Sequence, residues 1–127
     1  MSNIWCYDEW KRWNDAGKPN DSNLTILSLH NNQLTQIDVS NLTNLTHLYL
    51  YNNQLTQIDV SNLTNLTHLS LSFNQLTQID VSNLINLTKL CVNNNPISQP
   101  LYYSYNIYDI KIITYNNYRC YIATDFL

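Results

Sequence analysis

The stretch "NNQLTQIDVSNLTNLTHL" spans residues 31–48, and the same letters return in full at residues 52–69. A third copy, altered at a few places, begins at Asn74. The copies start 21 residues apart, and self-similarity with a period of roughly 20–29 residues is typical of solenoids. The duplicated stretch therefore predicts a fold made of one short unit stacked upon itself.

Leucines and one asparagine hold the same places in every copy. The shared frame is L-x-x-L-x-L-x-x-N-x-L, and it is filled by Leu24, Leu27, Leu29, Asn32 and Leu34, by Leu45, Leu48, Leu50, Asn53 and Leu55, by Leu66, Leu69, Leu71, Asn74 and Leu76, and, in a degraded form, by Leu87, Leu90, Val92, Asn95 and Ile97. With these copies the chain resembles the leucine-rich repeat family over residues 23–100, and its unit is similar to bacterial, internalin-like repeats and to those of giant viruses.

The resemblance implies a leucine-rich repeat solenoid of the α/β class, mostly β, with a short parallel sheet on its concave face. It also implies a non-enzymatic protein that binds other proteins through that face. We expect a helical N-terminal cap over residues 1–22, four 21-residue repeats over residues 23–100 and a tyrosine-rich C-terminal cap over residues 101–127, all in one domain.

The segment "HLYLYN" at residues 47–52 shows how one copy builds the sheet. Apolar and polar residues alternate, which predicts a strand with Leu48 and Leu50 on one face and His47, Tyr49 and Tyr51 on the other. A lone strand cannot bury its leucines, but copies stacked in parallel bury them as continuous columns. The remaining residues of each copy carry no strong helix start and predict an irregular, turn-rich or 3₁₀ return.

Two polar columns recur with the repeat. In the family, the asparagine of the frame points inward and bonds loop backbone groups, so Asn32, Asn53, Asn74 and Asn95 are expected to form a structural ladder. Asp38, Asp59 and Asp80 also stack, and we expect each to accept hydrogen bonds near its own turn, for example from Ser40, Ser61 and Ser82. A calcium ladder is the alternative, but one carboxylate per repeat offers few of the six to eight oxygens that calcium takes.

Both ends of an open solenoid need caps. The segment "NIWCYDEWKRWNDAGKP" predicts a helix that Asn3 caps, with Cys6, Trp10 and Trp13 on one face and Gly17 at its end. The alternative to a cap is a binding helix. At the other end, "YDIKIITY" and "YRCYIAT" predict a hairpin with its turn at Asn116-Asn117, and this pair is either a cap or a strand edge that recruits another chain.

The outward strand positions vary between copies, whereas the scaffold letters hold. This contrast is expected of a constant frame that carries a recognition surface, and aromatic anchors suit such a surface. The candidate partner-binding residues are His30, His47, Tyr49, Tyr51, His68, Ser70, Phe73, Lys89 and Cys91. The partner is expected to be a protein or peptide, and the alternative is self-association through the tyrosine-rich C-terminal region.

Composition and motifs argue against other classes of function. The net charge is −3, with no basic run for nucleic acid and no apolar run long enough for a membrane. We find no catalytic motif and expect no cofactor. A metal at His47 and His68, with Cys91 as a third ligand, is the remaining alternative. Three widely spaced cysteines and an N-terminus unlike a secretory signal favour unpaired thiols and a cytoplasmic protein.

Overall fold

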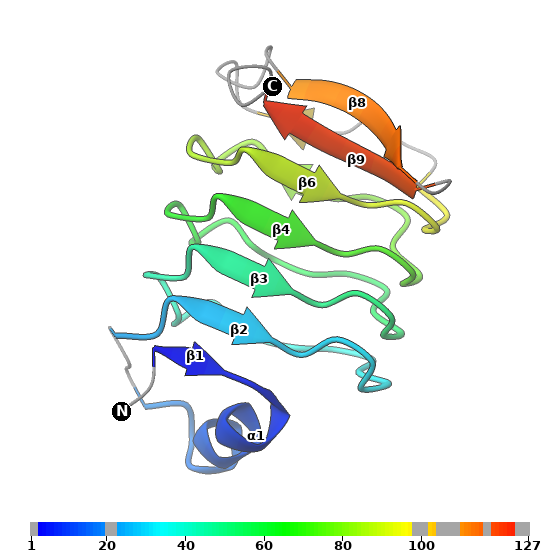
Figure 1. Ribbon diagram of the computed structural model, residues 1–127. Helices are drawn as coiled ribbons and strands as arrows, with labels where there is room; N and C mark the ends of the chain where they lie inside the picture. Colours follow the sequence, from blue (N-terminus) through cyan, green and yellow to red (C-terminus); the bar gives the residue numbers. More distant parts are fainter. Residues whose placement is uncertain (1–2, 20–22, 98–101, 104–109, 116–117, 124–127) are drawn as a thin grey trace.

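In the computed structural model, the described residues are 3–19, 23–97, 102–103, 110–115 and 118–123, and the four repeats stack as one solenoid (Figure 1). Each repeat contributes one short strand: β2 (Ile26–Ser28), β3 (His47–Tyr49), β4 (His68–Ser70) and β6 (Lys89–Cys91). Neighbouring strands pair in parallel, with each residue opposite its counterpart in the next copy. The register therefore reproduces the period of the sequence, and the predicted leucine-rich repeat solenoid is confirmed.

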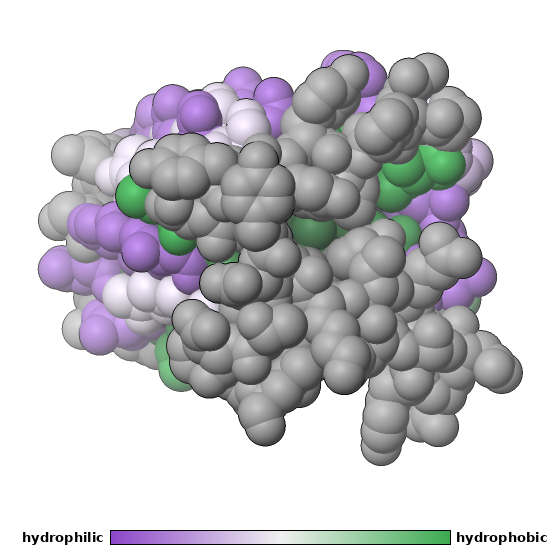
Figure 2. Space-filling model, turned by 90° about the horizontal axis from the view of Figure 1, so that it is seen from above, coloured by the Kyte–Doolittle hydropathy of each residue, from purple (hydrophilic) through white to green (hydrophobic). Residues whose placement is uncertain are grey.

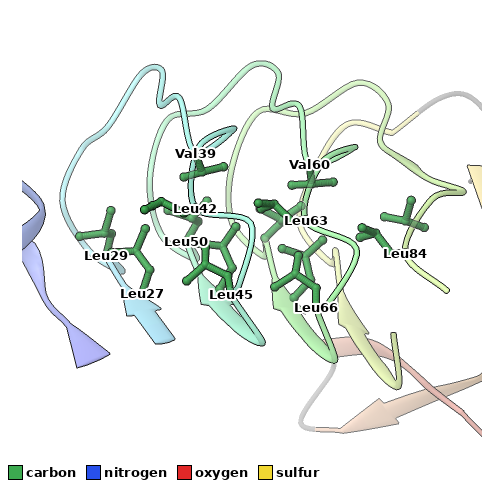
Figure 3. Packing of buried hydrophobic residues seen from close by; sticks show 14 of the residues in the cluster. Leu27, Leu29, Val39, Leu42, Leu45, Leu50, Val60, Leu63, Leu66 and Leu84 are labelled. Carbon is green, nitrogen blue, oxygen red and sulfur yellow. The ribbon is translucent and has the colours of Figure 1, made fainter. Parts of the chain in front are cut away.

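The alternating pattern decides what is buried. Leu27, Leu48, Leu69 and Leu90, at the centres of the four strands, are at most 1% exposed. Leu29 and Leu50, two residues further along, are also fully buried, and the return segments supply Val39, Leu42, Val60, Leu63 and Leu84 from the opposite side (Figure 3). The apolar side chains thus fill the space between sheet and returns as continuous columns, and their burial supplies the main driving force for stacking.

The return segments run without helix, as the sequence predicts. Within the described residues their only strand is β5 (Asp80–Val81), which pairs in parallel with β7 (Tyr102–Tyr103). Each return contains a tight turn. The N–H of Leu42 donates to Val39 O and the N–H of Leu63 donates to Val60 O, each with an N···O distance of 3.0 Å.

The asparagine of each frame bridges adjacent repeats. Asn53 Nδ2 donates one hydrogen bond to Leu29 O in the preceding repeat and one to Leu50 O in its own repeat, each with an N···O distance of 3.0 Å. Asn74 repeats this pattern with Leu50 O and Leu71 O, again over 3.0 Å. Because these side chains are buried, they give partners to turn groups that would otherwise be unpaired away from water.

The N-terminal cap combines a strand with a helix. β1 (Ile4–Trp5) pairs in parallel with β2, and helix α1 (Tyr7–Asp15) follows it. The prediction that Asn3 caps this helix is wrong: Cys6 is the N-cap, and Asn3 O instead accepts the N–H of Ile26 over 3.1 Å. The open edge of β2 recruits this backbone, because an extended segment satisfies its unpaired groups and a helix cannot.

Tryptophans seal the first repeat. Trp5, Trp10 and Trp13 are buried, and the rings of Trp5 and Trp13 lie with centroids 5.8 Å apart. Cys6 is exposed, so the predicted apolar face includes Trp10 and Trp13 without it. The helix ends as expected, with Gly17 in the left-handed region at a φ of 88°. No helix in the described part of the chain is long and apolar enough to cross a membrane.

A hairpin extends the other end of the sheet. β9 (Tyr118–Ala123) pairs antiparallel with β6, and β8 (Ile110–Tyr115) pairs antiparallel with β9. The strand order is β1-β2-β3-β4-β6-β9-β8, so the hairpin continues the repeat sheet. The two predicted strands are present, and their predicted turn at Asn116-Asn117 lies outside the described residues.

Polar residues dominate the described part of the rim on the side that faces the C-terminal end of the stack, and hydrophobic ones occupy smaller patches (Figure 2). Among the described residues whose exposure is known, the exposed large hydrophobic side chains are Ile4, Tyr7, Phe73 and Ile85. Ile4 lies on β1 at the edge of the sheet, Tyr7 lies in helix α1, Ile85 lies in a return segment, and Phe73 lies in the turn after β4.

Candidate functional site

The outward face of the repeat sheet carries two registered columns of side chains. The first column contains Ile26, His47, His68 and Lys89, and the second contains Ser28, Tyr49, Ser70 and Cys91. The buried leucines between them point to the opposite side of the sheet, so these residues share the solvent face. The sheet therefore brings together side chains that are 21 residues apart in the sequence.

The two histidines of the first column stack face to face. Their ring centroids lie 4.3 Å apart, and their planes differ by only 12°. Each Nδ1 contacts the hydroxyl of the preceding threonine, at 2.8 Å for Thr46 and 2.9 Å for Thr67. When those hydroxyls donate their single proton to Thr25 O and Thr46 O, each Nδ1 carries the ring hydrogen and each Nε2 is left as an acceptor.

Stacking argues against the metal alternative for this pair. The lone pair of an imidazole nitrogen lies in the plane of its ring, and two nearly parallel planes cannot direct their lone pairs at one ion. Among the residues that the structure describes, no group of three or more potential ligands lies together to hold a metal. The pair is better suited to receive hydrogen bonds from a partner's N–H or O–H groups.

Electrostatics keep one ring of this pair neutral. Burial lowers the pKa of His68, and the neighbouring His47 and Lys89 lower it further because a second positive charge there would be repelled. Both histidines are half-buried. The lowered pKa favours the neutral form of His68, which lies next to the exposed ammonium of Lys89 in the same column.

A second aromatic pair lies beside the first. The rings of His30 and Tyr51 stack with centroids 4.7 Å apart and planes within 9°, and Tyr49 packs at an angle against His47 with centroids 6.1 Å apart. Ser28 Oγ contacts His30 Nδ1 at 3.0 Å. These contacts hold the predicted aromatic residues in fixed positions, which reduces the entropy they would lose on binding.

The C-terminal side of the face differs from the prediction. Cys91 is only 8% exposed, because β9 continues the sheet next to β6, and it offers little surface to a partner. Ser72 and Asn93, which the alternation also places outward, are buried and hydrogen-bonded to each other through Ser72 Oγ and Asn93 Oδ1. Ser70 is half-buried and stays on the face.

Phe73 lies in the turn after β4 and not on the strand. Its φ is 57°, in the left-handed region where the equivalent residues Asn31, Asn52 and Asn94 have φ values of 61°, 57° and 57°. Asparagine tolerates this region, whereas a bulky side chain there is strained. Phe73 is nevertheless 39% exposed, so an apolar ring occupies a costly turn position at the rim of the face.

The opposite side of the solenoid holds a groove that sequence reasoning missed. Its volume is about 890 Å³, and it runs along the glutamine, isoleucine and aspartate columns of the returns to Trp10, Asn14 and Lys18 of the N-terminal cap. Its signal in the sequence was the repeated triplet Gln-Ile-Asp, of which we assigned the aspartates to turn formation. The groove has the same triplet of side chains in the first three repeats, so it lacks the variation seen on the sheet.

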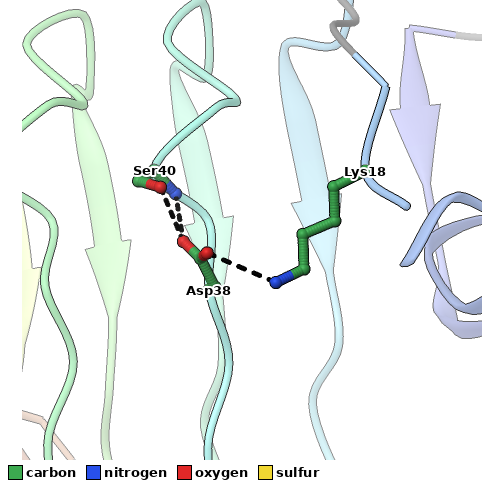
Figure 4. A network of polar contacts seen from close by, with 3 residues as sticks. All are labelled: Lys18, Asp38 and Ser40. Carbon is green, nitrogen blue, oxygen red and sulfur yellow. Dashed lines mark hydrogen bonds and ion pairs between the residues drawn. The ribbon is translucent and has the colours of Figure 1, made fainter. Parts of the chain in front are cut away.

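The aspartates of this groove hold their own turns, as expected. Asp38 Oδ1 accepts two hydrogen bonds from Ser40, one from its hydroxyl at 2.7 Å and one from its backbone N–H at 3.0 Å. Lys18 Nζ lies 3.3 Å from Asp38 Oδ2 (Figure 4). The Ser40 bonds chiefly lower the pKa of Asp38 to about 2, and Lys18 adds to the effect. Asp59 and Asp80 accept the same pair of bonds from Ser61 and Ser82.

Comparisons with known proteins agree with this architecture. A family model described as leucine-rich repeats in two copies matches residues 22–63 and 64–103. One similar solved structure is the functional domain of InlJ from Listeria monocytogenes, described as including a cysteine ladder, with 35% identity and a TM-score of 0.61. The alignment covers 62% of this chain and 18% of that one, so this chain spans less than a fifth of its length. No curated protein matches the chain.

Proposed function

Because the chain belongs to the leucine-rich repeat family, whose domains are generally protein-interaction modules, we propose that it is a non-enzymatic protein that binds a peptide, strand or loop through the concave face of its sheet. The observation that carries the proposal is the variation of the outward column Ile26, His47, His68 and Lys89 between repeats whose buried positions stay constant. A surface that varies on a fixed scaffold is what recognition requires.

The arrangement of the face supports a small partner. The four repeat strands, at about 4.8 Å spacing, span only roughly 15–20 Å of the seven-stranded sheet, whereas a standard protein interface needs about 800 Å² from each partner. The stacked pairs His30–Tyr51 and His47–His68 offer flat rings with fixed orientation. A short extended segment with N–H or O–H donors opposite the histidine acceptors and an apolar side chain near Phe73 would fit this surface.

The test begins with peptides selected on the immobilised protein from a displayed library. Calorimetry then compares binding of a selected peptide to wild type, Tyr49→Ala and Tyr51→Ala, with Gln57→Ala on a return segment as the matched control. We expect each tyrosine variant to weaken binding by about 1–4 kcal/mol, the range of interface anchors. Loss of binding in Gln57→Ala with unchanged binding in both tyrosine variants would move the site to the groove.

A second candidate function is self-association through the C-terminal hairpin. The observation that favours it is the position of β8 at the end of the sheet, where six residues present one backbone edge beyond the hairpin partner β9. Such an edge can pair with a strand of another chain. Sedimentation velocity over a wide concentration range tests it, because edge pairing gives a concentration-dependent dimer and a capping hairpin gives a monomer throughout.

A further inference from the structure

Two cysteines that are far apart in the sequence meet across the junction between the last repeat and the hairpin. In the antiparallel pairing of β6 with β9, Lys89 lies opposite Ile122, Leu90 opposite Tyr121, and Cys91 opposite Cys120. Leu90 belongs to the buried leucine column. Since alternate residues of a strand occupy opposite faces, the register assigns Cys91 and Cys120 to the same, outward face of the sheet.

Directly opposed residues of an antiparallel pair satisfy the spacing of a disulfide. Their Cα atoms are typically about 4.5–5.5 Å apart, and disulfides join Cα atoms about 4.4–6.8 Å apart. We propose that Cys91 and Cys120 form a reversible cross-strand disulfide that joins the C-terminal hairpin to the last repeat. This modification site is independent of the proposed binding function, and the wide spacing of the cysteines along the chain does not predict it.

The oxidant in this proposal is a low-molecular-weight disulfide such as oxidised glutathione. One cysteine thiolate attacks a sulfur of the oxidant, forms a mixed disulfide and releases one reduced thiol. The second cysteine, after losing its proton, attacks the protein sulfur of that mixed disulfide and releases the second thiol. Two protein thiols are thereby oxidised to one disulfide while one oxidant disulfide is reduced to two thiols, so atoms and electrons balance.

The disulfide would hold the hairpin over the C-terminal end of the repeat stack. β9 continues the sheet where the leucine columns of the repeats would otherwise end at β6. A bond across β6 and β9 keeps that end covered even when the hairpin hydrogen bonds open. Because Cys91 is only 8% exposed, the oxidant reaches it through local opening of the β6–β9 pair, and we expect oxidation to become faster at urea concentrations below the unfolding transition.

The experiment uses the full chain carrying Cys6→Ser, which removes the exposed third cysteine. The protein is equilibrated with oxidised and reduced glutathione, quenched with acid, and mapped by mass spectrometry without reduction. We expect a peptide containing Cys91 to be linked to one containing Cys120 within a monomer. The oxidised form should melt on the order of 10 °C higher than the reduced form, because the bond closes a loop of intermediate length.

Two matched variants test the register. In Cys6→Ser/Cys120→Ser/Ile122→Cys the new thiol faces Cys91 only diagonally, about 7–8 Å away, and no link should form. In Cys6→Ser/Cys91→Ser/Cys120→Ser/Lys89→Cys/Ile122→Cys a directly opposed pair is restored, and the link should return. Mixed disulfides with glutathione at Cys91 and Cys120 without a link, or links only between two molecules, would overturn the proposal, as would equal linkage in the diagonal variant.

Discussion

The carboxamide oxygen of Asn53 accepts a hydrogen bond from the backbone N–H of Leu34 in the preceding repeat, with an N···O distance of 3.0 Å. The same oxygen accepts the N–H of Asn32 over 3.1 Å, while Nδ2 donates to carbonyls of both repeats. One buried side chain thus satisfies backbone groups that belong to two turns. Such groups cost about 1–3 kcal/mol each when they lose their partner away from water.

Replacing Asn53 should therefore weaken the whole stack. We expect Asn53→Leu to lower the free energy of unfolding by at least about 3 kcal/mol, since several groups lose a partner at once. Urea denaturation followed by circular dichroism measures this change. Asn52 is exposed but holds a φ of 57°, which makes Asn52→Ala a poor control. Gln57→Ala, on an exposed return, is the better control, and equal midpoints for it and Asn53→Leu would contradict the role of the ladder.

Replacing Phe73 by asparagine, in contrast, should stabilise the fold. The equivalent turn positions in the other repeats are asparagines with the same left-handed backbone. Phe73→Asn should therefore raise the free energy of unfolding by about 1 kcal/mol, because asparagine fits a positive φ better than a bulky side chain. If Phe73 contacts the partner, the same variant weakens binding of the selected peptide. Phe73→Leu, which keeps the strain, serves as the control, and a destabilised Phe73→Asn would contradict this account.

The repeat made most of the solenoid predictable. Leu27, Leu48 and Leu69 fall in one frame, and a frame repeated without change in length leaves one parallel register. The local sequence could not predict that Ile4 and Trp5 form a strand. They pair with the open edge of β2, and that edge exists only after the repeats stack. Local patterns describe an element, but pairing across an edge depends on the assembled neighbour.

The candidate site was predictable only in outline. Alternation placed His47 and Tyr49 outward, but whether an outward side chain remains accessible depends on what lies beside it. Cys91 is buried because a hairpin from the end of the chain pairs next to its strand. The face-to-face geometry of His47 and His68 likewise follows from the threonine contacts at Nδ1, which fix ring orientation in a way that spacing alone does not.

Trp13 should be the most sensitive position of the N-terminal cap. It is buried against Trp5, and its Nε1 donates to Pro19 O over 2.6 Å. Trp13→Ala should lower the free energy of unfolding by about 3–5 kcal/mol, because it leaves a cavity and removes the hydrogen bond to Pro19 O. The neighbouring Arg12 is exposed, and Arg12→Ala should change stability by less than about 0.5 kcal/mol. A similar melting temperature for both variants would show that the cap does not stabilise the repeats.

His68 should make the stability of the fold depend on pH near neutrality. Burial and the neighbouring His47 and Lys89 lower the pKa of His68 in the folded state. As pH falls, the unfolded chain therefore binds a proton at this residue before the folded chain does, and the equilibrium moves toward unfolding. The stabilisation is complete above the unfolded pKa of about 6.5 and is lost as pH falls from there toward the lower folded pKa.

Urea midpoints measured between pH 8 and pH 5 test this sign. The range stays above the ordinary carboxyl pKa of about 4, where the unfolded chain begins to protonate Asp38, whose pKa in the folded state is about 2. We expect the midpoint of the wild type to fall with pH and that of His68→Gln to fall less, since glutamine keeps a polar side chain but cannot bind the proton. Gln57→Ala, which removes no titratable group, is the control and should retain the wild-type difference between the two pH values. A wild-type midpoint that rises as pH falls would mean that the folded state stabilises the charged ring, as a neighbouring carboxylate would, and would contradict the neutral ring inferred for His68.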